Sequence, residues 1–196
     1  MHPAIDDIHD YWFGPLDDTG MANAIKEKLW FQSTNEDDEV CQIRFGPLVQ
    51  EAIAGGLDDW AESDKGLVAL ILLLDQFTRT IYRGTPAAFS GDARALALAQ
   101  HCIAHGHHQR LPAIHQVFLY LPLEHCEDLD VQNECVELFD ALGSITGIAR
   151  VADFGRYAVA HREVIEKFGR FPHRNPILGR SSSPEEEEYL QTHGGF

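Results

Sequence analysis

The sequence predicts an all-α fold, an array of about nine antiparallel helices. Apolar residues recur with helical spacing along the chain, and no run of alternating β-branched residues stands between turn signals. Short connections between medium-length helices favour antiparallel neighbours. The 196 residues are expected to form a single domain, 1–196, because no linker or low-complexity segment divides them.

Three helices are expected near the N-terminus. The first covers about 3–13 and the second about 20–31. The third begins near Asn35, a good N-cap, and stops at Gly55-Gly56. We expect it to bend or restart at Gly46-Pro47, because proline removes an amide donor and crowds the preceding turn.

The middle of the chain contains the most apolar helix. Ser63 can cap it, and "LVALILLLDQFTRTIY" extends it to Gly84. Because it is apolar almost all round, it is expected at the centre of the fold. A fifth helix should run from Ser90 to Gly106, and a sixth should cover 112–125 with a break at Pro122.

Three further helices are expected at about 128–142, at about 149–168 and from Ser183 onward. Ser183 and Glu186 form a Ser-x-x-Glu capping box, and Pro184 takes the first helical position. This helix start explains the glutamates at 185–188, since acidic side chains are favourable in a first turn. Prolines and glycines before it predict an ordered loop.

The charge balance argues against two classes of partner. A formal net charge of −16 would repel nucleic acid and anionic membrane surfaces. No apolar run approaches the roughly 20 residues of a membrane span. With no basic leader, no apolar signal core and no Cys-x-x-Cys pair, we expect a cytoplasmic protein with reduced thiols.

No cofactor or metal is expected. The spacing of His101 and His105 can hold zinc, but the glutamate of a His-Glu-x-x-His motif is missing. The sequence also contains no glycine-rich phosphate loop.

Polar residues on apolar helix faces are candidates for a functional site. Asp75 and Arg79 continue the apolar stripe of the fourth helix; they can pair internally or face a cleft. His161 lies inside another apolar stripe, as a satisfied core histidine or as one tuned in a cleft. In "LPLEHCED", Glu124 can orient the ring of His125, or the bend can be a solvated turn in which Asp128 caps the next helix.

The segment 161–182 interleaves cationic residues with phenylalanine and proline. Guanidinium groups bind carboxylate or phosphate through paired hydrogen bonds. Two interpretations are open: these arginines bind a small anion, or they pair with surplus acids of the chain itself.

Four stretches carry a family resemblance. They are "YWFG" at 11–14, "LLLDQFTRTIYRGTPAAF" at 72–89, "FLYLPLEHCED" at 118–128 and "HREVIEKFGRFPHRNPILGRSSSPEEEEYL" at 161–190. They resemble an uncharacterised bacterial family, domain of unknown function 924. The resemblance implies an all-helical fold similar to tetratricopeptide-like arrays, and it implies no reaction. Where members of this family often read Asp-Gln-Phe-Pro-Arg-Asn, this chain has Thr78 and Thr80, and Thr78 removes an expected helix kink.

The candidates combine into one hypothesis, a pocket for a small anionic ligand (carboxylate or phosphate) with acid/base catalysis by histidine. The expected catalytic residues are His125, His161, His173, Glu124 and Asp75. The expected ligand-binding residues are Arg79, Arg162, Arg170, Arg174, Asn175 and Arg180. The alternative is a helical scaffold that binds a peptide or protein without catalysis, with tryptophans as anchors. A third interpretation gives these residues a structural role alone.

Overall fold

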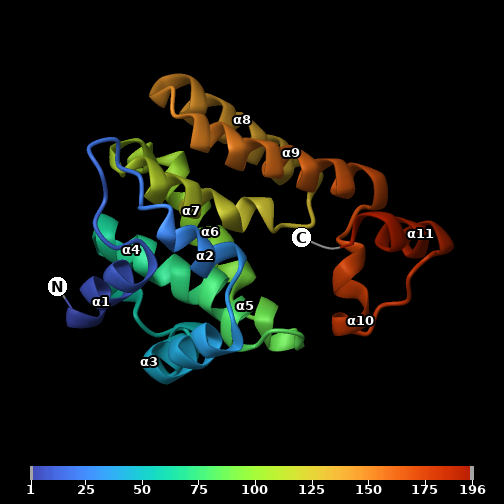
Figure 1. The fold of residues 1–196 in the computed structure, drawn as a ribbon, viewed down its shortest axis with the longest axis horizontal. Coiled ribbons are helices and arrows are strands. Elements are labelled where there is room, and N and C mark those ends of the chain that lie inside the picture. The colour runs from blue at the N-terminus through green and yellow to red at the C-terminus, as the bar shows by residue number, and fades with distance from the viewer. Residues whose placement is uncertain (1, 195–196) are drawn as a thin grey trace.

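The computed structural model describes residues 2–194, and every named element in this part of the chain is a helix (Figure 1). The α-helices are α1 (Pro3–Trp12), α2 (Ile25–Phe31), α3 (Asn35–Ile53), α4 (Asp64–Ile71), α5 (Thr78–Ile81), α6 (Asp92–Ala104), α7 (Ala113–Glu124), α8 (Leu129–Thr146), α9 (Ala149–Phe168), α10 (Asn175–Leu178) and α11 (Pro184–His193). Short 3-10 helices are η1 (Asp58–Glu62), η3 (Pro86–Phe89), η4 (His107–Arg110) and η5 (Pro172–Arg174), and η2 (Leu72–Phe77) is a π-helix. The all-α prediction is confirmed, and the tetratricopeptide-like arrangement stays a prediction.

The central helix is continuous from Asp64 to Ile81 through α4, η2 and α5. Its apolar residues are almost fully buried, as the sequence predicted. A regular helix was expected, but the turn at Leu72–Phe77 is π-helical. The Thr78 hydroxyl, just after this wide turn, donates to the carbonyl oxygen of Leu74 within it at 2.8 Å.

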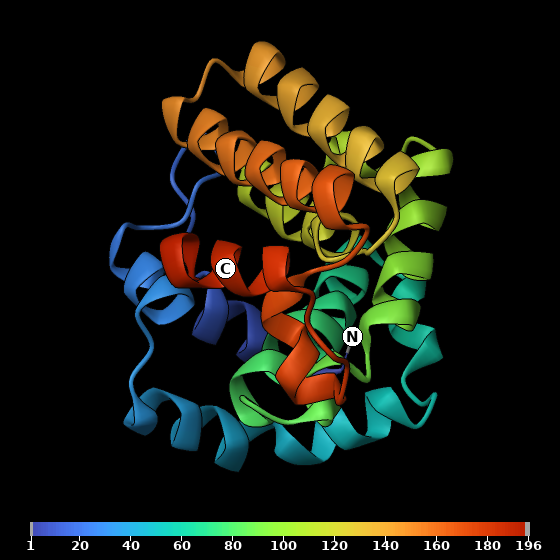
Figure 2. The ribbon, with the colours of Figure 1, turned by 90° about the vertical axis from the view of Figure 1, so that its right-hand side faces the viewer.

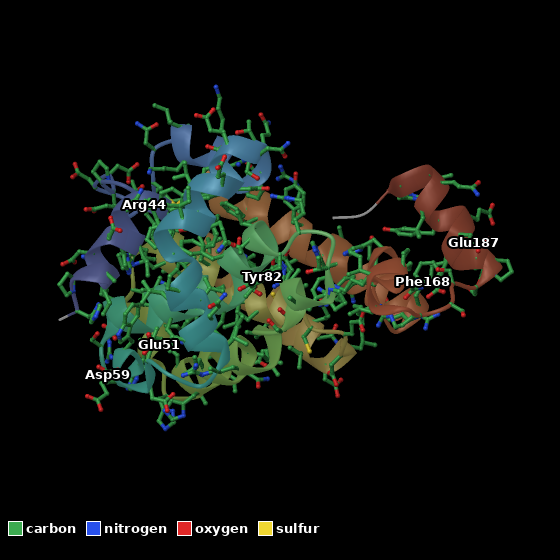
Figure 3. The ribbon with its side chains drawn as sticks, turned by 90° about the horizontal axis from the view of Figure 1, so that it is seen from below. Arg44, Glu51, Asp59, Tyr82, Phe168 and Glu187 are labelled. Atoms are coloured by element: carbon green, nitrogen blue, oxygen red, sulfur yellow. The ribbon has the colours of Figure 1, made fainter. Side chains whose placement is uncertain are left out.

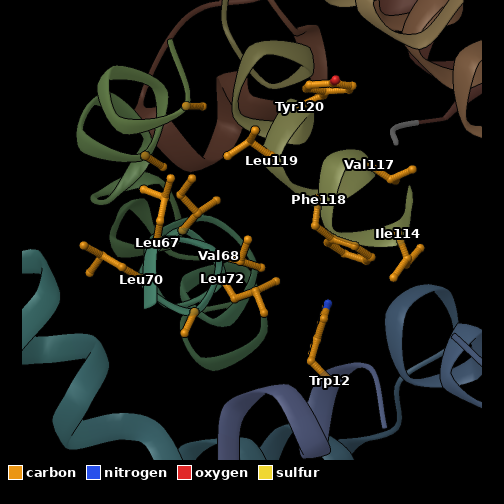
Figure 4. Close-up of a cluster of buried hydrophobic side chains, with 14 of the residues drawn as sticks. Trp12, Leu67, Val68, Leu70, Leu72, Ile114, Val117, Phe118, Leu119 and Tyr120 are labelled. Carbon is orange, nitrogen blue, oxygen red and sulfur yellow. The ribbon is translucent and has the colours of Figure 1, made fainter. Parts of the chain in front are cut away.

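Most of the buried apolar side chains form one large cluster around this helix and α7. Figure 4 shows Trp12 pointing toward Phe118, and their ring centroids lie 5.7 Å apart. Helices α8 and α9 lie side by side along one edge of the molecule (Figures 1 and 2). Such packing of two long helices is favourable because each buries an apolar stripe against its neighbour.

The C-terminal segment packs separately. A small second cluster joins Val164 and Ile165 of α9 to Phe171, with Phe168 and Tyr189 at its edge. Figure 3 shows Phe168 and Glu187 at one end of the molecule, beyond the main body. This segment therefore depends more on polar contacts than the rest of the chain.

Several boundaries differ from prediction. Helix α2 begins at Ile25 rather than at 20, because Asp17 accepts from the amides of Thr19 and Met21 and holds the preceding turn. Pro47 does not break α3, which continues to Ile53. Burial of Phe45 and Val49 on both sides of this proline offsets the loss of one hydrogen bond.

Pro122 likewise lies inside α7, which continues to Glu124 because its flanking residues are buried.

The predicted loop before α11 contains two short helices, η5 and α10. The predicted capping box is present: Ser183 and Glu186 exchange hydrogen bonds, and Pro184 begins the helix.

Candidate functional site

Charged and histidine side chains from distant parts of the chain meet where η2 and α5, the end of α7, α9 and η5 come together. We call this group the polar cluster. It consists of Asp75, Arg79, Asp92, Glu124, His125, His161, His173 and Arg174. Seven of these residues were predicted as site residues, and Asp92 was not.

Asp75 is the fully buried centre of the polar cluster. Its Oδ1 lies 2.8 Å from Nδ1 of His125 and 3.1 Å from Nη1 of Arg79, and Gln76 donates to Oδ2 at 2.6 Å. Burial raises the pKa of Asp75, but the Arg79 charge and the His125 contact outweigh it, so the pKa is lowered. An ionised Asp75 therefore accepts a hydrogen bond from the Nδ1–H of His125 and fixes its tautomer.

Arg79 joins Asp75 to Asp92 at the start of α6. Its guanidinium donates to both carboxylate oxygens of Asp92, at 2.8 and 3.0 Å. The predicted internal pair of Asp75 and Arg79 is present, but Asp92 shares it. Gly91 allows the start of α6 to lie this close to η2, because a Cβ at this position would overlap the carbonyl oxygen of Leu74.

Arg174 is a buried cation whose pairing is incomplete. Its Nη2 donates to the carbonyl oxygen of His125 at 2.9 Å, while Nη1 lies 3.7 Å from Asp92. The guanidinium lies over the rings of Phe89 and Phe171, at 4.8 and 4.6 Å. Nε is buried and has no hydrogen-bond partner among the described residues. Burial and the nearby Arg79 lower the pKa of Arg174 to about 10, so it is charged at neutral pH.

Glu124 is a buried carboxyl without a cation beside it. Its Oε1 lies 3.3 Å from Nδ1 of His161, which itself lies 2.8 Å from the carbonyl oxygen of Tyr157. Burial and the Asp75 charge raise the pKa of Glu124 to about 8, so it is largely protonated at pH 7. Its Oε2 is buried and has no hydrogen-bond partner among the described residues.

The three histidines of the polar cluster are neutral at pH 7. Burial, followed by the charge of His125, lowers the pKa of His161 to about 3. Burial and Arg174 lower the pKa of His173 to about 4. The pKa of His125 is also lowered, first by burial and then by Arg79, against the raising effect of Asp75. Neutral imidazoles can accept protons, which charged ones cannot.

The other predicted ligand-binding residues lie outside the polar cluster. Arg180 donates to both oxygens of Glu127, at 2.7 and 2.9 Å, and also to Asn175. Arg170 binds both oxygens of Glu186, at 2.6 and 2.8 Å. These arginines pair with carboxylates of the chain itself, which was the second interpretation of this segment.

Asn175 donates to Ser182, while Arg162 lies 3.8 Å from Glu166 on the surface of α9. Both residues therefore serve contacts within the C-terminal part of the chain.

Three important residues were missed by sequence reasoning. Asp92 pairs with Arg79, Phe89 lies beneath the two arginines, and Glu127 holds the C-terminal segment. Asp92 had only the weak signal of an acid in a first helical turn. Phe89 had none, because its position depends on the close approach of η3 to η5.

Residues 2–194 meet neither the requirements of a metal site nor those of a membrane-spanning helix. Within this range no three His, Cys, Asp or Glu side chains are arranged to hold a metal ion. The rings of His101 and His105 are 4.3 Å apart, but His105 Nδ1 already contacts the His101 carbonyl oxygen. None of the described helices combines the length and the apolar character that crossing a membrane would require.

A family model described as a bacterial protein of unknown function, DUF924, matches residues 8–194. The chain belongs to this family. The solved structure of a protein of unknown function, ATU0120 from Agrobacterium tumefaciens, is similar at 34% identity. That similarity covers 96% of this chain and 97% of that chain, with a TM-score of 0.81. No curated protein matches the chain.

Three of the four stretches that carry the DUF924 resemblance meet at the polar cluster. Residues 72–89 supply Asp75 and Arg79, and residues 118–128 supply Glu124 and His125. Residues 161–190 supply His161, His173 and Arg174. In this DUF924 protein, the stretches are distant in sequence and adjacent in space.

Proposed function

We propose that this DUF924 protein binds a small anionic molecule at the polar cluster and uses His125 as its acid/base group. One observation carries the proposal: a neutral histidine held by a buried aspartate lies beside an incompletely paired arginine. Structural ion pairs alone do not require a histidine in this position.

The arrangement suits proton transfer. Because Nδ1–H of His125 donates to Asp75, its Nε2 presents a lone pair, and no described residue hydrogen-bonds to that atom. Asp75 would stabilise the imidazolium that forms when Nε2 takes up a proton. Asp75 is thus a positioning residue, and His125 is the group that meets the ligand.

The charges favour an anion over a cation. The charge of Arg79 is compensated by Asp75 and Asp92. Arg174 forms one long ion pair, with Nη1 at 3.7 Å from the Asp92 carboxylate that Arg79 already binds. A ligand oxygen beside Arg174 would complete its pairing. The cluster reaches solvent, since the side chains of Arg79 and Asp92 are 22% and 25% exposed. We assign Arg170, Asn175 and Arg180 to holding the segment that carries Arg174. Arg162 instead pairs with Glu166 within α9.

Calorimetric titration of the full chain with acetate, lactate and phosphate tests the proposal. Arg174→Met should weaken binding of the recognised anion at least about tenfold, because a buried charge partner is lost. Arg110→Met, which removes an exposed arginine paired with Asp64, is the matched control and should bind normally. The proposal fails if none of the three anions binds, or if a folded Arg174→Met variant binds them as well as the parent.

Peptide binding is a second candidate, favoured by a groove of about 360 Å³ between α2 and α9. Phe31 and Tyr157 line it and are 55% and 58% exposed. The three tryptophans expected as anchors do not line it. Trp12 and Trp60 are buried in the core, and the half-buried Trp30 packs against the core ring of Phe118. The occupant would be a peptide that inserts one apolar side chain. If so, Phe31→Ser should abolish binding of peptides selected on the parent; equal binding to the variant would exclude this groove.

A further inference from the structure

Two buried donor groups of the polar cluster have no acceptor among the described residues. They are Nε of Arg174 and the Oε2 atom of Glu124. Both side chains are more than nine-tenths buried, at 7% and 4% exposure. An unsatisfied buried donor costs about 1–3 kcal/mol, so two in one cluster indicate a missing acceptor.

The geometry identifies Oε2 as the protonated oxygen of Glu124. Nδ1 of His161 lies 2.8 Å from the Tyr157 carbonyl oxygen, so this nitrogen carries a hydrogen. Oε1 of Glu124 faces the same N–H at 3.3 Å and is therefore the acceptor oxygen of the carboxyl. Oε2 then carries the O–H, consistent with the pKa raised to about 8 by burial and the Asp75 charge.

The cluster thus offers a ligand three unfilled positions. Arg174 offers a charged donor, Glu124 offers a neutral donor, and Nε2 of His125 offers an acceptor. A carboxylate suits Arg174, because one negative charge matches one incompletely paired cation. A hydroxyl suits the other two positions together, since it accepts one hydrogen bond and donates another.

We infer, building on the proposed function, that the ligands of this site are small hydroxycarboxylic acids. The carboxylate faces Arg174, and the hydroxyl accepts from Glu124 and donates to His125. A plain carboxylic acid would leave the Glu124 donor and the His125 acceptor unfilled. A phosphate dianion would bring a second negative charge close to Asp75 and Asp92, where no further unpaired cation of the cluster compensates it.

Matched pairs of acids test this inference by calorimetry on the full chain at pH 7. The pairs are glycolate with acetate, lactate with propionate, and 3-hydroxybutyrate with butyrate, so the spacing of the two groups varies. One hydroxy acid should bind about three- to tenfold more tightly than its partner, the gain typical of a hydrogen bond to a buried donor.

Variants of Glu124 test whether this residue causes the preference for the hydroxy acid. Glu124→Gln keeps an N–H donor and should retain most of the preference. Glu124→Met has no donor, so the ratio of the two affinities within a matched pair should fall toward one. Gln116→Met is the matched control, because Gln116 is another buried polar residue of α7, bonded to the Leu111 carbonyl outside the cluster. If Glu124→Met does not fold, the parent protein at pH 9.5 serves instead: ionised Glu124 loses its donor, and the preference should disappear.

The outcomes separate this inference from the function on which it rests. Equal binding of hydroxy and plain acids, with binding still dependent on Arg174, would overturn the inference and leave the anion site. A preference that survives Glu124→Met, or that persists at pH 9.5, would also overturn it. If none of these acids binds, both the inference and carboxylate binding at this site fail.

Discussion

Glu124 shows how a single buried side chain links stability to pH. Its pKa is raised from 4.5 to about 8, first by burial and then by the Asp75 charge. Between these values the folded chain holds a proton that the unfolded chain releases. The free energy of unfolding contributed by this group therefore falls as pH rises through that window, by about 1.4 kcal/mol for each unit of pKa shift at most.

Glu124→Gln should remove this dependence. Relative to the parent, its free energy of unfolding should increase from pH 5 to pH 8 and change little above, because glutamine has no proton to lose. Urea unfolding at pH 5, 6.5 and 8 measures this difference. Glu166→Gln, at an exposed carboxyl of α9, is the control and should show no such growth. A flat difference for Glu124→Gln would mean that Glu124 is ionised in the folded chain.

The sequence predicted the local part of this chemistry. The capping role of Asp128, the pairing of Asp75 with Arg79 and the burial of His161 all follow from spacing along one helix, and the structure contains each. The contact of Asp75 with His125 spans 50 residues and the role of Asp92 depends on α6. No periodicity encodes such contacts, because they arise when separate helices pack.

Among the helices, the central one was predicted well in position but not in geometry. The apolar run that predicts α4 and its continuation does not distinguish an α-turn from the π-turn at Leu72–Phe77. The helix breaks predicted at Pro47 and Pro122 are absent for a similar reason. Burial of the residues on both sides of each proline outweighs the loss of one backbone hydrogen bond. Helix existence was therefore predictable, and helix detail depended on packing.

Gly91→Ala tests the close approach of α6 to the π-turn. A Cβ at this position would overlap the Leu74 carbonyl oxygen, although the backbone of Gly91, with φ −92, is acceptable for alanine. We expect a loss of about 1–3 kcal/mol or more in the free energy of unfolding, as for other overpacked sites. Thermal and urea unfolding measure it.

Gly143→Ala provides the control for that substitution. A Cβ at Gly143 in α8 has open space around it, so alanine should be neutral or stabilising by up to about 1 kcal/mol. If both variants were equally stable, the contact between Gly91 and the π-turn would not constrain the helix.

Across the whole molecule, Glu127 supplies the carboxylate that makes the most hydrogen bonds to the C-terminal segment near the polar cluster, where Arg174 also contacts the His125 carbonyl oxygen. Glu127 accepts two hydrogen bonds from Arg180 and one, at 2.8 Å, from the amide of Phe171. The apolar cluster beneath this segment is small, so loss of the charge should loosen residues 170–193 more than α7.

Glu127→Gln should therefore raise amide hydrogen exchange in residues 170–193 about tenfold while α7 stays protected. Exchange measured by mass spectrometry resolves these regions. Glu166→Gln removes a carboxylate that lies 3.8 Å from Arg162, and it should leave exchange unchanged. Uniform exchange changes across the chain, or none, would show that Glu127 does not hold this segment.

The protonation of His125 is the decisive property of the proposed site. Nitrogen-15 NMR of the labelled protein at pH 7 should show a neutral ring protonated at Nδ1, because Asp75 accepts that hydrogen. Saturation with the bound carboxylate should shift its Nε2 resonance, and the shift should vanish in Arg174→Met. A His125 ring that is charged without ligand, or one that does not respond to any of the acids, would contradict the account.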